Sequence, residues 1–402
     1  MGGEAQHGNG EKMNTHARNA RLDWLRGISA LIVCAGHTRN ALLPDFADLP
    51  NHGLFEQAVY FLTGYGHAAV IVFFVLSGYL VGGSVLTPGA NFNWRTYLVN
   101  RYVRLWVVLL PALAWTWLVD QQTLALAPQV LNGGLSQNWH SLPAPGEYSS
   151  DWKTFFMNMA FQQTVNAPVF GSNGPLWSLA NEAWYYLLFP LLALPLKERR
   201  WQVALTHLPL AALMLVFMPR DMALLFPVWV AGAMLRRLPA GLLNGRSLWG
   251  AFAAAAFFAT LIAYKKLGPD RFDALVWDWL IALPCVCWVA YLVQNASQTP
   301  LSLSNRLAIK LSDFSYSLYL VHMPMAVLFG AMLSVPAKRA GHMQDFLIFA
   351  FALLSEVMLA YGFWWVFERK TNMYKNIFLK SPGGSFVRRR GWVWGQSLWP
   401  KS

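Results

Sequence analysis

Apolar stretches of about 20 residues recur along the whole chain, and they constrain its fold more than any other feature. Of the 402 residues, 56% are hydrophobic and 12% are charged. Soluble domains carry about 25% charged residues, and each apolar stretch is long enough to cross a hydrocarbon layer about 30 Å thick. The sequence therefore predicts an all-α, polytopic integral membrane protein.

The basic residues lie in clusters between apolar stretches, as the positive-inside rule describes. We expect ten membrane-spanning helices with both termini in the cytoplasm. This topology accounts for the net charge of +12, so we expect no nucleic-acid partner. The expected helices cover residues 22–42, 60–84, 98–119, 175–195, 201–218, 222–236, 247–264, 274–294, 311–334 and 345–367.

The remaining segments predict a simple domain organisation. Residues 1–20 form a cytoplasmic N-terminal tail, 21–370 the transmembrane domain, and 371–402 a basic cytoplasmic C-terminal tail. Residues 121–150 form a long outer segment, and 152–165 an additional short amphipathic or re-entrant helix.

Arg26 and His37 lie in the first expected helix, 11 residues apart. That spacing corresponds to about three turns, an angular offset of ~20° and a rise of roughly 16 Å. The two side chains therefore share one face at different depths. Ionisable residues inside a bilayer are costly and usually face the bundle interior. Snorkelling to the interface explains Arg26 equally well, whereas His37 lies too deep for that explanation.

A polar stripe runs along the fourth expected helix. Ser178, Glu182 and Tyr185 recur at positions i, i+4 and i+7. Glu182 lies roughly 10 Å from the outer end of its helix, at a depth similar to that of His37. A carboxylate near an imidazole is a candidate for acid/base chemistry; a purely structural buried pair is the alternative.

Two further features carry alternative interpretations. Ser77 and Gly78 form a small pair in a bulky stretch, which indicates either close helix packing or backbone open to a ligand. Arg101 and Arg104 share a helix face at the cytoplasmic surface. They reflect either topology alone or a cradle for phosphate. His67, near the outer end of its helix, is expected to be solvated.

The last two expected helices add polar groups. Ser315, Tyr319 and His322 share a face of the ninth, and Glu356 and Glu368 belong to the tenth. These residues either line a donor site or tie helices together, and we favour ties for the two glutamates.

Several motifs are missing from the sequence. It contains no G-x-x-x-x-G-K-[ST] and no H-E-x-x-H, so neither ATP-driven transport nor zinc proteolysis is expected. Cys34, Cys285 and Cys287 lie in apolar stretches without metal-ligand spacing, and we expect no metal.

Taken in order, five motifs resemble the acyltransferase 3 family of membrane acyltransferases, over about residues 20–370. Phe367-Glu368-Arg369 closes the pattern. The motifs are Arg-x10-His (Arg26 to His37), Phe-Phe-Val-Leu-Ser-Gly-Tyr-Leu (Phe73 to Leu80), Arg-Tyr-Val-Arg-Leu (Arg101 to Leu105), Trp-Ser-Leu-x-x-Glu (Trp177 to Glu182) and Ser-Tyr-Ser-Leu-Tyr-Leu-Val-His (Ser315 to His322).

The resemblance implies transfer of an acyl group, most often acetyl, from cytoplasmic acyl-coenzyme A to a hydroxyl of a cell-envelope acceptor. Exopolysaccharides and lipid-linked glycans are typical acceptors, and the bacterial inner membrane is the implied location. The implied partners are acyl-coenzyme A, the glycan or lipid-linked sugar, and membrane lipid.

Within this resemblance each candidate residue has an expected role. His37 acts as general base, with an ordinary pKa near ~6.5 that suits the task. Glu182 orients His37 or stabilises its protonated form. The pantetheine arm, ~15–20 Å long, matches the Arg26–His37 rise. The expected donor-binding residues are Arg26, Arg101, Arg104, Ser77, Tyr319 and His322.

The sequence leaves alternatives open. The donor is acetyl- or succinyl-coenzyme A, and transfer is direct or passes through an acyl-histidine. The competing class is a transporter of lipid-linked glycans or acyl groups. Binding of acyl-coenzyme A would distinguish the acyltransferase from this transporter. The acceptor's identity and a homo-oligomeric state are not decided by the sequence.

Overall fold

The computed structural model describes residues 19–87, 92–132, 139, 146–268, 273–295, 302–333 and 338–380. This part of the chain is almost entirely helical, which confirms the predicted fold class. Six helical stretches in it are long and apolar enough to cross a membrane, and the expected count of ten is not confirmed. The six stretches are 54–86, 94–126, 247–267, 274–294, 303–333 and 343–379.

Every expected membrane helix coincides with a helix in the structure. The main helices are α1 (Ala20–Leu42), α3 (Gly66–Ser77), α4 (Gly83–Leu86), α5 (Trp94–Leu126), α8 (Leu176–Glu198), α9 (Trp201–Phe217), α10 (Arg220–Met234), α11 (Ser247–Leu267), α12 (Ala274–Gln294), α13 (Leu303–Leu333) and α14 (Met343–Val366).

Shorter elements connect the main helices. They are η1 (Phe46–Asp48), α2 (Leu54–Leu62), the π-helix η2 (Gly78–Gly82), α6 (Pro128–Leu131), α7 (Trp152–Met159), η3 (Leu235–Arg237), η5 (Glu368–Lys370), α15 (Thr371–Leu379), and the strands β1 (Tyr148–Ser149) and β2 (Val169–Phe170), which pair in parallel.

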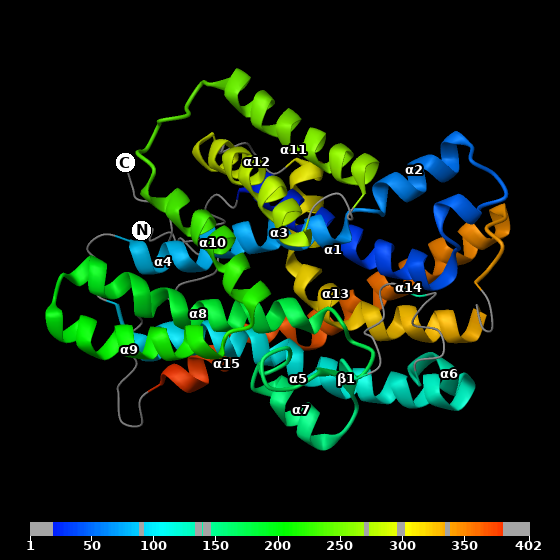
Figure 1. The fold of residues 1–402 in the computed structure, drawn as a ribbon, viewed down its shortest axis with the longest axis horizontal. Coiled ribbons are helices and arrows are strands. Elements are labelled where there is room, and N and C mark those ends of the chain that lie inside the picture. Colours follow the sequence, from blue (N-terminus) through cyan, green and yellow to red (C-terminus); the bar gives the residue numbers. More distant parts are fainter. Residues whose placement is uncertain are drawn as a thin grey trace, which may run out of the picture.

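Helix α1 lies at the centre of the bundle, packed against α13 on one side and α3 on the other. Helix α13 also packs on α5 and α14, while α11 and α12 form a pair along one edge (Figure 1). The face of α1 that carries Arg26 and His37 is therefore enclosed by helices, as ionisable side chains in a membrane protein require.

Small residues bring α3 and α10 into direct backbone contact. A Cβ added to Gly78 would overlap the carbonyl oxygen of Trp229, and one added to Gly232 would overlap that of Val75. Of the two interpretations of Gly78, close helix packing is the one that the structure supports. The π-helix η2 begins at Gly78, and such turns are frequent at functional sites.

The segment after β1 confirms the short helix expected at 152–165, in a shorter form. Helix α7 ends at Met159, and a loop follows. The side chain of Asp151 caps α7, and the hydrogen bond from the backbone N–H of Thr154 lowers the pKa of that carboxyl. The third expected helix runs on as α5 to Leu126, so part of the expected outer segment is helical. Most of both expected tails, 1–20 and 371–402, lies outside the described residues.

Candidate functional site

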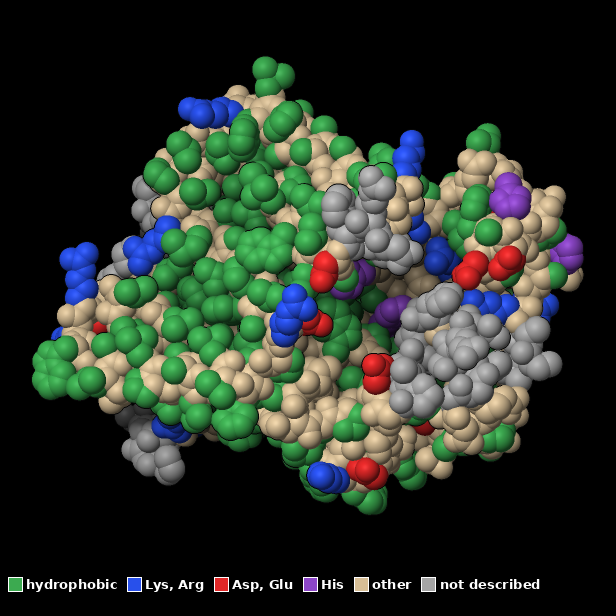
Figure 2. Space-filling view, in the orientation of Figure 1, with side chains coloured by type: hydrophobic (Ala, Val, Ile, Leu, Met, Phe, Trp, Pro, Cys, Tyr) green, Lys and Arg blue, Asp and Glu red, His purple; other side chains and the backbone are tan. Residues whose placement is uncertain are grey.

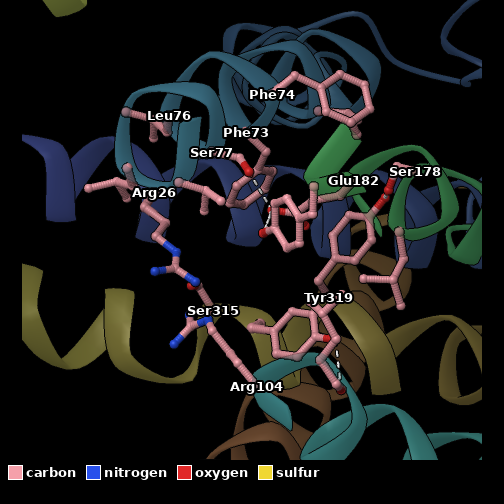
Figure 3. Close-up of a pocket in the computed structure, with 17 residues that line it drawn as sticks. Arg26, Phe73, Phe74, Leu76, Ser77, Arg104, Ser178, Glu182, Ser315 and Tyr319 are labelled. Atoms are coloured by element: carbon pink, nitrogen blue, oxygen red, sulfur yellow. Dashed lines mark hydrogen bonds between the residues drawn. The ribbon is translucent and has the colours of Figure 1, made fainter. Parts of the chain in front are cut away.

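An interior cavity of about 80 Å³ lies between α1, α3, α5, α8 and α13. Arg26 and Arg104 point into it from α1 and α5 (Figure 3). We call it the arginine cavity. Its polar lining comprises Arg26, Ser77, Arg104, Ser178, Glu182, Tyr186, Ser315, Tyr316 and Tyr319. Two guanidinium groups facing one enclosed space make it a suitable place for an anion, because arginine binds phosphate through a planar array of donors.

Glu182 is held on the wall of the arginine cavity by two hydroxyl groups. The hydroxyl of Ser77 donates to its Oε1 across 2.5 Å, and the hydroxyl of Tyr186 donates to the same oxygen. Trp229 of α10 in turn donates its indole N–H to the Ser77 oxygen across 3.1 Å. This chain of hydrogen bonds joins α3, α8 and α10 and fixes the position of the carboxylate.

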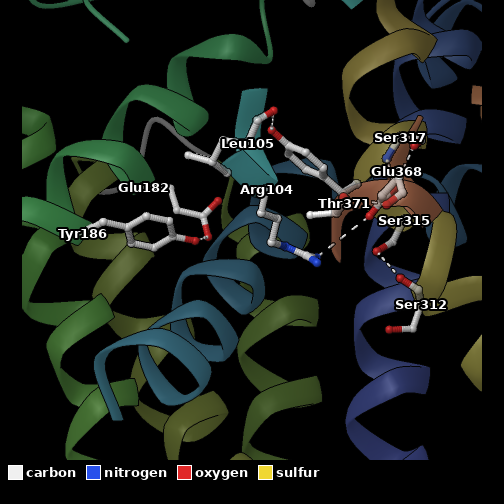
Figure 4. A network of polar contacts seen from close by, with 10 residues as sticks. Arg104, Leu105, Glu182, Tyr186, Ser312, Ser315, Ser317, Glu368 and Thr371 are labelled. Atoms are coloured by element: carbon white, nitrogen blue, oxygen red, sulfur yellow. Dashed lines mark hydrogen bonds and ion pairs between the residues drawn. The ribbon is translucent and has the colours of Figure 1, made fainter. Parts of the chain in front are cut away.

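Arg104 faces a second carboxylate at the edge of the same cavity. Its guanidinium lies 3.9 Å from Oε1 of Glu368 (Figure 4). The other oxygen of Glu368 accepts hydrogen bonds from the backbone N–H and the hydroxyl of Ser317, at 3.2 and 2.7 Å. Glu368 thus ties η5 to α13 and α5, which agrees with the interpretation that we favoured for this residue.

Arg101 occupies a different place from Arg104. It is not among the residues that line the arginine cavity, and its guanidinium carbon lies 5.9 Å from the centre of the Tyr97 ring. Its Nε is buried and has no hydrogen-bond partner among the described residues. The expected contact of Arg101 with phosphate therefore stays a prediction, whereas Arg26 and Arg104 share one cavity.

His37 and His322 form a stacked pair between α1 and α13. Nδ1 of His37 lies 2.8 Å from Nε2 of His322, and the rings are parallel within 1°. Nδ1 of His322 lies 2.9 Å from the carbonyl oxygen of Leu318. Since a carbonyl oxygen only accepts, this nitrogen carries the hydrogen.

The tautomer of one ring determines that of the other. In neutral His322, Nε2 must then be the acceptor, so Nδ1 of His37 donates to it. Neutral His37 consequently keeps an unprotonated lone pair on Nε2. This is the form of imidazole that can accept a proton from a substrate.

The expected contact between Glu182 and His37 is replaced by another pairing. His322 bonds to His37, while Glu182 bonds to Ser77 and Tyr186. Similar depth in two helices does not bring side chains together unless their faces also meet. His322, expected among the donor-binding residues, instead positions His37.

A second cavity of about 530 Å³ begins where the arginine cavity ends. We call it the histidine cavity. Tyr319 and Val70 line both cavities, and the Tyr319 hydroxyl lies 2.6 Å from that of Ser178. The histidine cavity is lined by Val33, His37, Gly66, His67, Val70, Glu147, Thr164, Pro168, Val169, Gly174, Pro175, Trp177 and Tyr319.

The surface view shows a hollow in which histidine side chains lie near acidic ones (Figure 2). One histidine–carboxylate pair was not expected from the sequence. Nε2 of His67 lies 2.6 Å from Oδ1 of Asp278 on α12, whose side chain is 3% exposed. The expected solvent exposure of His67 is present, with 43% of its side chain exposed, but its carboxylate partner was not predicted. The signal was present, since a carboxylate within an apolar stretch indicates a partner nearby.

A buried carboxyl group on α14 bonds to the turn of α1 that carries His37. Oε2 of Glu356 accepts hydrogen bonds from Cys34 and Thr38, at 2.8 and 2.6 Å. All three side chains are fully buried. Glu356 therefore ties α14 to α1, as we expected, and stabilises the turn that carries His37.

Comparison with known proteins identifies the family. A model of the acyltransferase domain family called acyltransferase 3 matches residues 19–365. The chain belongs to this family. The resemblance seen in the motifs is thereby confirmed, and the protein is a multi-pass membrane protein of an acyltransferase family.

One relative gives a more specific comparison. YrhL of Bacillus subtilis (strain 168), a protein named as a peptidoglycan O-acetyltransferase, is 30% identical over 137 residues. The match covers 31% of this chain and 19% of YrhL, so the chain matches about one fifth of that relative's length. No solved structure matches the chain.

Proposed function

We propose that this protein transfers an acyl group, acetyl in the first instance, from acyl-coenzyme A to a hydroxyl of a cell-envelope glycan. The observation that carries the proposal is the His37–His322 pair, because it leaves Nε2 of His37 as a base in a cavity that adjoins two arginines. The family and the partial similarity to YrhL support O-acylation of a glycan. The proposed location is the bacterial inner membrane, with both termini in the cytoplasm.

The proposed reaction needs one base, which takes a proton from the acceptor and returns it to the leaving group. Nε2 of His37 takes the proton of the acceptor hydroxyl as its oxygen attacks the thioester carbonyl carbon. The C–S bond then breaks, and the coenzyme A sulfur leaves with the bonding electrons. His37 returns the proton to that sulfur, which gives the ester, free coenzyme A and neutral His37.

The donor's charge suits the arginine cavity. Arg26 and Arg104 would hold phosphate groups there, beside Ser77, and Tyr319 lines both this cavity and the one that contains His37. The ~16 Å rise between Arg26 and His37 is comparable to the length of the pantetheine arm. A succinyl donor and an acyl-histidine relay fit the same arrangement, with Nε2 of His37 as the nucleophile in the relay.

The proposal is tested by mass spectrometry of cell-envelope glycans from cells with and without the gene. We expect a mass increment of one acyl group per modified sugar, which identifies donor and acceptor together. This mass increment should disappear in cells that produce the His37→Ala variant. The amount of variant protein in the membrane is measured as well and should equal that of the wild type. If the glycans are unchanged and the protein transports a lipid-linked glycan, the result would instead favour a transporter.

A further inference from the structure

The His67–Asp278 pair lies in the histidine cavity but has no part in the mechanism above. His67 is in the first turn of α3, and its side chain is 43% exposed. Asp278 is buried in α12, so its carboxylate is fixed as an acceptor, 2.6 Å from Nε2 of His67. With Nε2 bonded to this carboxylate, Nδ1 is the remaining polar atom of the ring, a donor when His67 is protonated and an acceptor when it is neutral. The pair therefore presents an oriented ring nitrogen at the edge of a cavity.

An aromatic surface lies beside the ring of His67. The ring of Trp177 stacks near that of His67, with centroids 6.3 Å apart and planes inclined by 20°. Trp177 lines the same cavity as both histidines. The electron-rich face of an indole attracts the weakly positive C–H groups of a sugar ring. The ring nitrogen of His67 and the indole face of Trp177 together match a sugar, which has hydroxyl groups on its rim and C–H groups on its faces.

Another part of the lining, the loop that carries Pro168 and Val169, is fixed by buried hydrogen bonds. Asn158 donates to the carbonyl oxygen of Pro168 and accepts from the N–H of Phe170, at 2.9 and 3.0 Å. Asp120 accepts from both the N–H and the hydroxyl of Ser172. Thr164, which lines the cavity, has a φ of 65°, an outlier for a β-branched residue. Such a loop is held in one shape before a ligand arrives.

The charges of the two cavities differ in sign. In the lining of the arginine cavity, the two guanidinium groups of Arg26 and Arg104 outnumber the one carboxylate of Glu182. Glu147 lines the histidine cavity, and the carboxylate of Asp278 lies behind His67. Carboxylates disfavour a phosphorylated ligand and favour a neutral, hydroxyl-rich one. The two cavities therefore suit different reactants.

We propose that His67, held by Asp278, and Trp177 form a sugar-binding subsite for the acceptor. Nδ1 of His67 forms a hydrogen bond with a hydroxyl group of the sugar, which can donate or accept, and Trp177 packs against the sugar ring. This orients another hydroxyl toward Nε2 of His37. The inference rests on the proposed function for its role in catalysis, but sugar binding itself is measured independently.

The test uses the full chain in lipid nanodiscs and the tetrasaccharide of β-1,4-linked N-acetylglucosamine as probe. Equilibrium binding of the probe is measured for the wild type, His67→Gln and Trp177→Ala. Glutamine keeps a donor for Asp278 but lacks the second ring nitrogen that would bond to the sugar. We expect each variant to bind about tenfold more weakly, the effect of losing one good hydrogen bond or packing contact. Trp177→Phe, which keeps an aromatic plane, should restore part of the affinity.

His207 provides a matched control. It contacts Trp94, with ring centroids 5.7 Å apart, and neither residue lines either cavity. His207→Gln should bind the probe like the wild type. Equal binding by all variants, or no binding by the wild type, overturns the subsite. If the variants lose binding of the probe but the wild type acetylates no glycan, the proposed function is wrong and the sugar-binding subsite is supported.

Discussion

Nδ1 of His37 lies 2.8 Å from Nε2 of His322, and the two rings are parallel within 1°. His322 is fully buried, and the carbonyl oxygen of Leu318 fixes its tautomer. The pair has the arrangement of a base with an orienting partner, in which a second imidazole takes the place that a carboxylate often has. Catalysis by His37 should therefore depend on His322.

Replacing His322 tests this dependence. His322→Leu removes the acceptor for Nδ1 of His37, so the ring can rotate or adopt the other tautomer. We expect the rate of acyl transfer to fall by about 10²–10⁴, the usual contribution of a positioned base. His322→Gln, whose side-chain oxygen can accept the same hydrogen bond, should retain an intermediate rate. Initial rates of glycan acetylation measure the effect, and wild-type rates for both variants would contradict it.

Arginine variants should separate the roles of Arg26, Arg104 and Arg101 in donor binding. Arg26→Gln and Arg104→Lys should each weaken coenzyme A binding about tenfold, because a charge or a planar donor array is lost. Arg101→Ala should have a smaller effect, since Arg101 does not line the cavity.

Thermal stabilisation of the protein by coenzyme A measures this binding. Arg95→Ala is the control, because Arg95 is exposed and donates to the carbonyl oxygen of Phe378. If Arg101→Ala proves as damaging as Arg26→Gln, the assignment of phosphate to the arginine cavity is wrong.

Gly78→Ala should destabilise the protein through the contact between η2 and α10. The new Cβ would overlap the carbonyl oxygen of Trp229, and overpacking of this kind costs about 1–3 kcal/mol. Gly362→Ala on α14 is the matched control, because a Cβ there meets nothing within 4 Å. Melting temperatures in detergent should fall for the first variant and stay equal or rise for the second. Equal melting temperatures would show that the close approach is unimportant.

Glu356→Gln should destabilise the protein less than Glu356→Ala. The amide oxygen of glutamine can accept the hydrogen bonds from Cys34 and Thr38, but its NH2 group would replace Oε1, which has no hydrogen-bond partner among the described residues. Alanine leaves the Cys34 thiol without its acceptor and opens a space beside α1, whereas the Thr38 hydroxyl can still donate to the carbonyl oxygen of Cys34. A buried group without a partner costs about 1–3 kcal/mol, and the space left by alanine adds to that cost. The melting temperature should therefore fall further for the alanine variant, and an equal fall in both would point to a need for the carboxyl group itself.

The sequence predicts the helices of this protein well because hydropathy and helix length are local properties. The expected helix at 274–294 coincides with α12, and the one at 22–42 differs from α1 by two residues. The third expected helix ends too early, since polar residues in α5 are covered: Asp120 is fully buried against Ser172.

Contacts between helices were harder to predict. Glu182 and His37 have similar expected depths, yet they line different cavities. Depth follows from counting residues, but the facing direction of each helix depends on the packing of the whole bundle. The partner of His37 comes from α13, 285 residues away in sequence. Asp278 could have been found as a charge in an apolar stretch, although its partner His67 could not.

The most direct test of the account is acetyl transfer by the purified chain carrying His37→Gln, in nanodiscs with acetyl-coenzyme A and a cell-envelope glycan. Release of coenzyme A and formation of the glycan ester are followed together, and thermal stabilisation by coenzyme A confirms that the variant binds the donor. The account predicts that donor binding persists while ester formation falls by about 10²–10⁴, the contribution of a general base. Ester formation at the wild-type rate would contradict it.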